Sequence, residues 1–154
     1  MLSYVLVALA VIPSPVLMFI NSEAIAVVFG LRGAPPLAIA GALAVGQTIG
    51  FSLIFLFGEA LCERSTRLQA RLGRFDVERF KTRTPPLIAL ASVFGLPPLN
   101  LSCVVASAMG ASLLPLLPLI ISGRFVRYWL VASIPAYFAQ YVDVTWLPAW
   151  LSPT

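Results

Sequence analysis

Three long stretches of this chain contain no charged side chain. Residues 1–22, 33–58 and 84–123 lack Lys, Arg, Asp and Glu. A helix that crosses a bilayer needs roughly 20 apolar residues, so the longest stretch has room for two membrane-embedded elements. The pattern predicts an all-α integral membrane protein with a single membrane domain, whose length allows about four to six such elements.

The first apolar stretch is interrupted before it can form one long helix. Pro13 and Pro15 remove backbone donors and disfavour a helix that runs through them. Asn21 or Ser22 is a good N-cap, and Glu23 suits the first turn of a helix that we expect over residues 22–31. That helix is too short to span a bilayer. A broken apolar element with a polar centre is typical of a re-entrant hairpin.

Residues 34–58 are the best candidate for a spanning helix. Gly46 and Gly50 lie on it among several alanines, and small residues at this spacing let two helices approach closely. We expect these glycines to be packing residues. The small-residue faces are compatible with a homodimer but do not require one.

Most of the charge lies in one segment, residues 59–83. It holds seven of the ten basic residues and four of the six acidic ones. Its arginines recur every three or four residues, which predicts a short basic amphipathic helix on the membrane surface. The positive-inside rule places this segment in the cytoplasm. Topology thus explains the net charge of +4, and no nucleic-acid partner is expected. The arginines on this face are Arg64, Arg67, Arg71 and Arg74.

The second half repeats the order of the first. Pro97 and Pro98 break an apolar run just before Asn100, a short helix follows, and Gly123 lies in a second spanning helix expected over residues 111–135. In this comparison Asn21, Gly30 and Pro35 correspond to Asn100, Gly110 and Pro115. With a cytoplasmic basic segment between them, the two halves would enter the membrane from opposite faces as an inverted repeat, an arrangement typical of transporters.

These elements divide the chain into four parts of one domain. The C-terminal part contains Trp146 and Trp150, which suit the membrane interface. The predicted parts are repeat one over 1–58, the cytoplasmic linker over 59–83, repeat two over 84–137 and an interfacial tail over 138–154.

Three charged residues lie at membrane depth and need a partner. A charge at the bilayer centre costs roughly 2.5–3.5 kcal/mol even on lenient scales. Arg124 and Arg127 lie one turn apart in the second spanning helix, and we expect Glu23 to face one of them across the repeats. A purely architectural ion pair is one alternative, and the other is that Arg127 with Tyr128 marks the end of the helix at the headgroups. We also expect Asn21, Gln47 and Asn100 to be polar residues of the same site.

The sequence offers little for metal, cofactor or enzyme chemistry. It has no histidine and only two cysteines, Cys62 and Cys103. A zinc or haem site therefore lacks its usual ligands, and the serines lack any base other than Glu23. We expect no cofactor, no metal and no enzymatic activity.

Three motifs together resemble the DedA/VTT superfamily, with most similarity to its small YqaA-like branch. They are NSE at residues 21–23, GQTIG at 46–50 and SGRFVRY at 122–128. The resemblance covers residues 12–132 and implies two opposed re-entrant hairpins that move lipids or lipid-linked carriers between leaflets. It equates Glu23 with the acidic residue of the first hairpin. Two features depart from the pattern, because Gln47 replaces a typical acidic residue and VFGLP at 93–97 lacks the usual arginine.

The leading functional prediction is therefore a translocator of lipids or lipid-linked carriers in a bacterial plasma-type membrane. Arg124 and Arg127 would hold an anionic headgroup near the midplane, and membrane lipids would be the partners. Two alternatives stay open. One is a small multidrug-type exporter that uses Glu23 to bind cations, and the other is a structural subunit of a larger membrane complex.

Overall fold

The computed structural model describes residues 2–17, 21–64, 77–96 and 98–141. Within these ranges the secondary structure is entirely helical, so the expected all-α class is confirmed. Pro36–Gly58 is the one described helix segment long and apolar enough to cross a membrane. The helices are α1 (Leu2–Val11), α2 (Ser22–Leu31), α3 (Pro36–Arg64), α5 (Val77–Phe94), α6 (Leu99–Ala108), α7 (Leu117–Ser133) and α8 (Pro135–Phe138).

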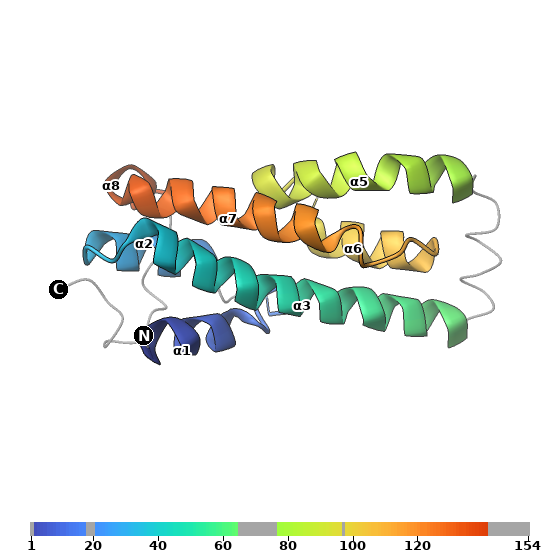
Figure 1. Ribbon diagram of the computed structural model, residues 1–154, viewed down its shortest axis with the longest axis horizontal. Coiled ribbons are helices and arrows are strands. Elements are labelled where there is room, and N and C mark those ends of the chain that lie inside the picture. Colours follow the sequence, from blue (N-terminus) through green and yellow to red (C-terminus); the bar gives the residue numbers. More distant parts are fainter. Residues whose placement is uncertain (1, 18–20, 65–76, 97, 142–154) are drawn as a thin grey trace.

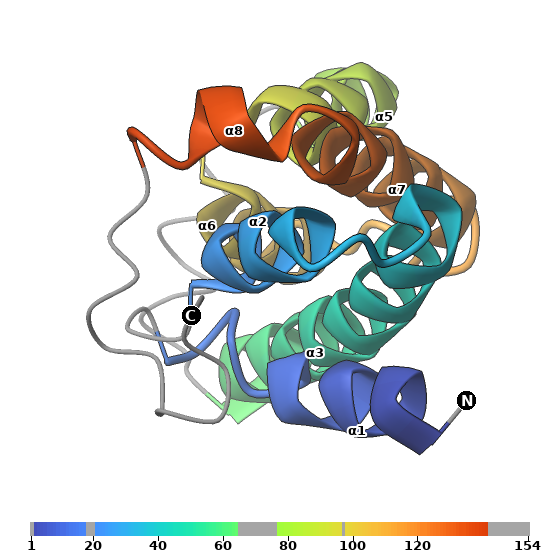
Figure 2. The same ribbon diagram turned by 90° about the vertical axis from the view of Figure 1, so that its left-hand side faces the viewer.

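Two pairs of helices occupy opposite ends of the molecule. The pair α1 and α2 lies at one end of the long axis and the pair α5 and α6 at the other, while α3 runs along both (Figure 1). Seen along this axis, α2 and α6 lie one behind the other (Figure 2). The C-terminal end of α1 and the C-terminal end of α5 both point toward the middle of the long axis (Figure 1).

The short helix α2 begins and ends where its sequence predicts. Asn21 caps α2, since its side-chain oxygen accepts hydrogen bonds from the backbone N–H groups of Glu23 (3.0 Å) and Ala24 (3.3 Å). This is the cap geometry that satisfies the free donors of a first turn. The expected short helix over 22–31 is confirmed.

The two short helices end in the same way. Gly33 (φ 74°) and Gly110 (φ 73°) adopt the left-handed backbone conformation that favours glycine. After each glycine the next backbone N–H bonds five residues back, from Ala34 to Phe29 and from Ala111 to Ala106, both at 3.0 Å. The C-terminal ends of α2 and α6 therefore correspond residue by residue, with Gly33 matching Gly110 and Ala34 matching Ala111. The sequence comparison was wrong in this register, because it matched Gly30 rather than Gly33 with Gly110.

Glycine allows the first helix of each pair to lie directly on a long helix. A Cβ on Gly46 would collide with the carbonyl of Ala8 in α1, and one on Gly123 would collide with Ser92 in α5. Gly50 has the same relation to Ile12 and Pro15. The glycine face of α3 is therefore covered by α1 of the same chain. A homodimer would need another surface.

The helices do not follow the two expected boundaries of the linker. Both ends of the proposed linker over 59–83 belong to helices, because α3 continues to Arg64 and α5 begins at Val77. Straight-chain charged residues are good helix formers, so charge marks where a helix leaves an apolar layer, not where it ends. α5 also passes through Pro85 and Pro86 without a break. The arginine face of the linker falls mainly on residues 65–76, which are outside the described residues. Trp146 and Trp150 are also outside them.

The second expected spanning helix is shorter than predicted. α7 begins at Leu117 instead of residue 111 and has 17 residues. Pro115 and Pro118 explain the late start, because each lacks a backbone donor and Pro118 is tolerated only in the first turn. A helix of this length rises about 26 Å, somewhat less than the roughly 30 Å hydrocarbon core.

The apolar core is divided into two clusters. One joins α1, α2, the first part of α3 and the end of α7, and the other joins the later part of α3 with α5, α6 and the start of α7. Gln47 lies on α3 between the clusters, at the midpoint of Pro36–Gly58. Arg124 lies between them on α7. The polar residues thus form a layer midway along the bundle.

Candidate functional site

A polar cavity of about 310 Å³ lies in this middle layer. It is bounded by residues that lie between the two helices of each pair and by the centres of α3 and α7. Every polar residue that the sequence analysis proposed lines it, although they come from four separate parts of the chain. They are Asn21, Glu23, Gln47, Asn100, Arg124 and Arg127.

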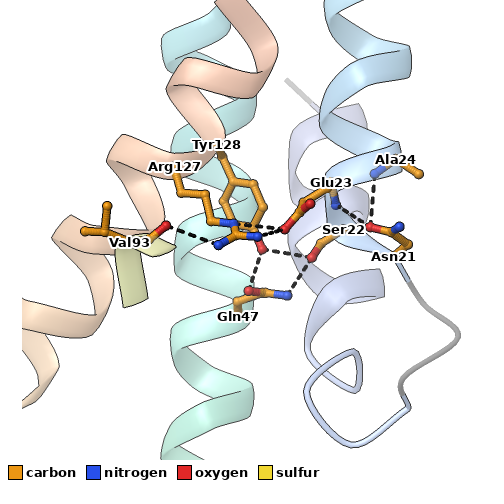
Figure 3. A network of polar contacts seen from close by, with 8 residues as sticks. All are labelled: Asn21, Ser22, Glu23, Ala24, Gln47, Val93, Arg127 and Tyr128. Atoms are coloured by element: carbon orange, nitrogen blue, oxygen red, sulfur yellow. Dashed lines mark hydrogen bonds and ion pairs between the residues drawn. The ribbon is translucent and has the colours of Figure 1, made fainter. Parts of the chain in front are cut away.

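Glu23 pairs with Arg127, which decides between the two arginines that the sequence left open. Arg127 donates from Nε (2.8 Å) and from Nη2 to the Oε1 atom of Glu23, and from Nη1 to the carbonyl of Val93 (3.1 Å). The pair ties α2 to α7 and to the end of α5 (Figure 3). The Arg127 and Glu23 side chains are 22% and 32% exposed, so the pair lies at the edge of the cavity.

Gly95 makes room for the arginine of this pair. A Cβ at this position would lie 2.7 Å from Nη1 of Arg127, and the backbone has φ +78°. Only glycine meets both conditions without strain. The sequence analysis did not single out Gly95, although it lies in the segment that departs from the DedA/VTT pattern.

Gln47 closes a ring of hydrogen bonds across three helices. Its Nε2 donates to Ser22 Oγ (2.6 Å), and its Oε1 accepts from the Tyr128 hydroxyl (2.5 Å). Ser22 and Tyr128 are 2.8 Å apart, and the ring is complete when Ser22 donates to Tyr128 (Figure 3). The second N–H of Gln47 donates to Ser14 (2.9 Å), whose hydroxyl donates to the Val11 carbonyl (2.6 Å).

This ring satisfies every polar group of a buried amide. All its members are buried, and Tyr128 is fully so. Satisfied networks of this kind rigidify a core, whereas a partly satisfied one is costly. Ser22 and Tyr128 were missed as site residues. Their sequence signals are that they lie in the NSE and SGRFVRY motifs and that each adjoins a charged residue of the pair, Glu23 or Arg127.

We expect Tyr128→Phe to lower the free energy of unfolding by about 1–2 kcal/mol. The change removes one hydroxyl at constant shape and leaves the buried Oε1 of Gln47 without a donor. Thermal unfolding in neutral detergent micelles measures the effect. Tyr137→Phe is the matched control, because Tyr137 is 55% exposed and removal of its hydroxyl leaves no buried group without a hydrogen-bond partner. Equal stability of the two variants would contradict the ring.

Arg124 differs sharply from its neighbour. It is only 9% exposed, its Nε has no hydrogen-bond partner among the described residues, and its guanidinium carbon lies 4.9 Å from the centre of the Phe51 ring. This is a cation–π geometry. Arg124 therefore brings a positive charge into the cavity, and no carboxylate among the described residues pairs with it.

The two asparagines lie at the two turns. Asn100 reaches across from the second turn, and its Nδ2 donates to the carbonyl of Pro15 in the first (3.4 Å). Asn21 engages its carbonyl oxygen in the helix cap, so the group it can offer a ligand is its NH₂. Both turns thus present amide groups to one space.

The prolines shape these turns. The Pro13 carbonyl accepts from the backbone N–H groups of Val16 (3.0 Å) and Leu17 (2.8 Å), and Pro15 lines the cavity. Pro98 is the N-cap of α6 and also lines the cavity. Pro97 lies outside the described residues.

Comparisons of the chain with protein families, curated proteins and solved structures found no match. The functional argument therefore rests on the site itself. Its cavity holds two guanidinium groups, one carboxylate and several neutral donors between two apolar clusters. Such a set of groups can bind an anion and separate it from hydrocarbon.

Proposed function

We propose that this chain is a membrane translocator of lipids or lipid-linked carriers, as its resemblance to the DedA/VTT superfamily implies. The observation that carries the proposal is the charged cavity midway along an apolar helical bundle. A headgroup that crosses a bilayer is most costly at the hydrocarbon centre, where it loses its hydration. A polar cavity at that depth lowers this cost while the acyl chains stay in lipid.

The outer surface of the bundle supports a multi-pass position in the membrane. Large apolar side chains are exposed on every long helix, a surface that would aggregate in water and is well solvated by hydrocarbon. A bacterial plasma-type membrane with residues 59–83 in the cytoplasm fits the charge distribution. Exposed examples are Leu6, Leu9, Leu53, Phe57, Leu90, Phe94, Leu101, Trp129 and Leu130.

The matching halves support an inverted repeat. Gly33 and Gly110 are separated by the same number of residues as Gly46 and Gly123. The same separation aligns the sequence of α2 with that of α6, and both helices have ten residues. A ten-residue helix rises about 15 Å, half of the hydrocarbon core. In the proposed mechanism each helix pair is a re-entrant hairpin from its own face of the membrane. The headgroup then binds where the two broken elements meet.

The charge of the cavity favours an anionic headgroup over the cation of a multidrug-type exporter. Two arginines face one carboxylate, and Glu23 is already engaged by Arg127. An organic cation would meet an excess of positive charge. The alternative of a structural subunit does not explain why a charged cavity lies between two apolar clusters.

A scrambling assay with the full chain in liposomes tests the proposal. We expect fluorescent lipid in the inner leaflet to become accessible to dithionite faster than in protein-free vesicles. Arg124→Leu should slow this exchange because it removes the unpaired cation. Arg83→Gln is the matched control, since it removes an exposed arginine far from the cavity lining. Equal rates with and without protein would refute transport.

A further inference from the structure

Arg124 is a buried cation that has neither a paired carboxylate nor a full set of hydrogen bonds among the described residues. Buried charges in proteins are paired or fully hydrogen-bonded, because desolvation is otherwise uncompensated. Among the described residues the Nε atom of Arg124 has no hydrogen-bond partner, and the guanidinium carbon lies over the Phe51 ring. Arg124 is one of the residues that line the polar cavity, where an anion can reach its guanidinium group and compensate its charge.

Arg127 differs from Arg124 because its charge is already paired with a carboxylate. Its three nitrogens already donate to Glu23 and to the carbonyl of Val93. Together, Glu23 and Arg127 contribute no net charge to the cavity. Among the described lining residues the net positive charge therefore comes from Arg124, with the amides of Asn21 and Asn100 as neutral donors.

A second cavity continues on the other side of the ion pair. It has a volume of about 280 Å³, and its walls are apolar apart from Glu23 and Arg127, which line both cavities. The apolar walls come from the end of α5, from α7 and from α8. The ion pair is thus a shared wall between a polar space and a hydrocarbon-like one. The apolar side chains are Val93, Phe94, Leu130, Val131 and Phe138.

We propose that Arg124 is the anion-binding residue and that the ligand is an anionic amphiphile. Its phosphate-type headgroup binds Arg124, and the first part of its hydrocarbon lies in the apolar cavity beyond Glu23 and Arg127. Guanidinium groups suit phosphate oxygens through charge-assisted hydrogen bonds. The inference deepens the proposed function by naming the binding residue and the two subsites, and binding can be measured without transport.

Ligand-induced stabilisation of the full chain in neutral detergent micelles tests the anion subsite. A ligand that binds only the folded state raises the melting temperature by mass action. We expect dihexanoyl phosphatidic acid to stabilise the wild type, and dihexanoyl phosphatidylcholine to do so much less. Arg124→Gln should weaken phosphatidic acid binding on the order of tenfold, the loss of one charge-assisted bond. Arg83→Gln should bind like the wild type.

Arg124→Lys keeps the test decisive if the glutamine variant does not fold. Lysine retains the charge but not the planar fork, so intermediate binding is expected. Undiminished binding of phosphatidic acid by either folded variant, or equal binding of phosphatidylcholine by the wild type, would overturn the assignment.

Inorganic phosphate tests whether the ligand needs a hydrocarbon chain. We expect it to bind Arg124 more weakly than phosphatidic acid, because it leaves the apolar cavity empty. Val93→Trp, which fills that cavity, should reduce phosphatidic acid binding toward the level of phosphate and leave phosphate binding unchanged. If phosphate and phosphatidic acid bind equally to the wild type, the apolar subsite is wrong. Lipid exchange in vesicles without phosphatidic acid binding would refute this inference alone, whereas binding without exchange would refute only transport.

Discussion

Gly46→Ala is expected to lower the free energy of unfolding by about 1–2 kcal/mol, although alanine is the better helix former. The added Cβ meets the backbone carbonyl of Ala8 and the side chain of Val11, and a backbone atom within a helix cannot rotate away. Overpacking of this kind costs about 1–3 kcal/mol or more. The loss outweighs the gain of roughly 1 kcal/mol that alanine brings to a helix. Thermal unfolding in micelles measures the balance.

Gly41→Ala is the matched control on the same helix. The nearest atom to its added Cβ is in the Phe125 ring, at 4.0 Å, an ordinary contact. The same substitution should therefore stabilise the chain by about 0.5–1 kcal/mol. Opposite signs at Gly46 and Gly41 would show that α1 lies against α3 in solution. If both variants are stabilised, α1 is not packed as described.

Displacing α1 also bears on the site. Ser14 and Pro15 follow α1 directly and line the cavity, and Ser14 accepts a hydrogen bond from Gln47. A single methyl group at Gly46 would thus disturb a cavity that it does not touch. The first helix of the chain is a structural support for the polar layer.

Local features of the fold were predictable from the sequence. Asn21 and Glu23 mark the start of α2 because cap and first-turn preferences depend on neighbouring residues only. The end of α2 near Gly33 follows from the same kind of local rule. Glu23, Arg124 and Arg127 could be predicted as site residues because each is a charge within an apolar run. A charge at membrane depth is costly unless it faces a partner or a polar cavity.

Features that depend on register were not predictable. Arg124 and Arg127 share one face of α7, so spacing alone could not tell which of them meets Glu23. That choice depends on how α2 lies against α7. The ring around Gln47 joins residues 25 and 81 positions away in the chain, and no local pattern relates them. The limits of α3 and α5 were missed because charge was taken to end a helix.

The pair of Glu23 and Arg127 should behave differently when one or both members are neutralised. Arg127→Gln leaves the Glu23 carboxylate without its cation and is expected to cost about 2 kcal/mol of unfolding free energy. A fully buried broken pair costs about 3–5 kcal/mol, and the partial exposure of this one reduces the loss. Glu23→Gln should cost less, since Arg127 keeps its bond to Val93. The double variant should recover most of the loss, and the cycle gives the coupling between the two side chains.

Transport by the double variant separates an architectural pair from a functional one. Since the pair is the wall between the polar and apolar cavities, neutral side chains would let α2 part from α7 at lower cost. Under the proposed function, we therefore expect the folded double variant to exchange lipid faster than the wild type in the dithionite assay, with weaker dependence on headgroup charge. Wild-type rates at wild-type stability would instead mean that the pair only holds the helices together. Because Arg124 remains in this variant, binding of phosphatidic acid should persist, so a change in rate would be traced to the wall and not to the anion subsite.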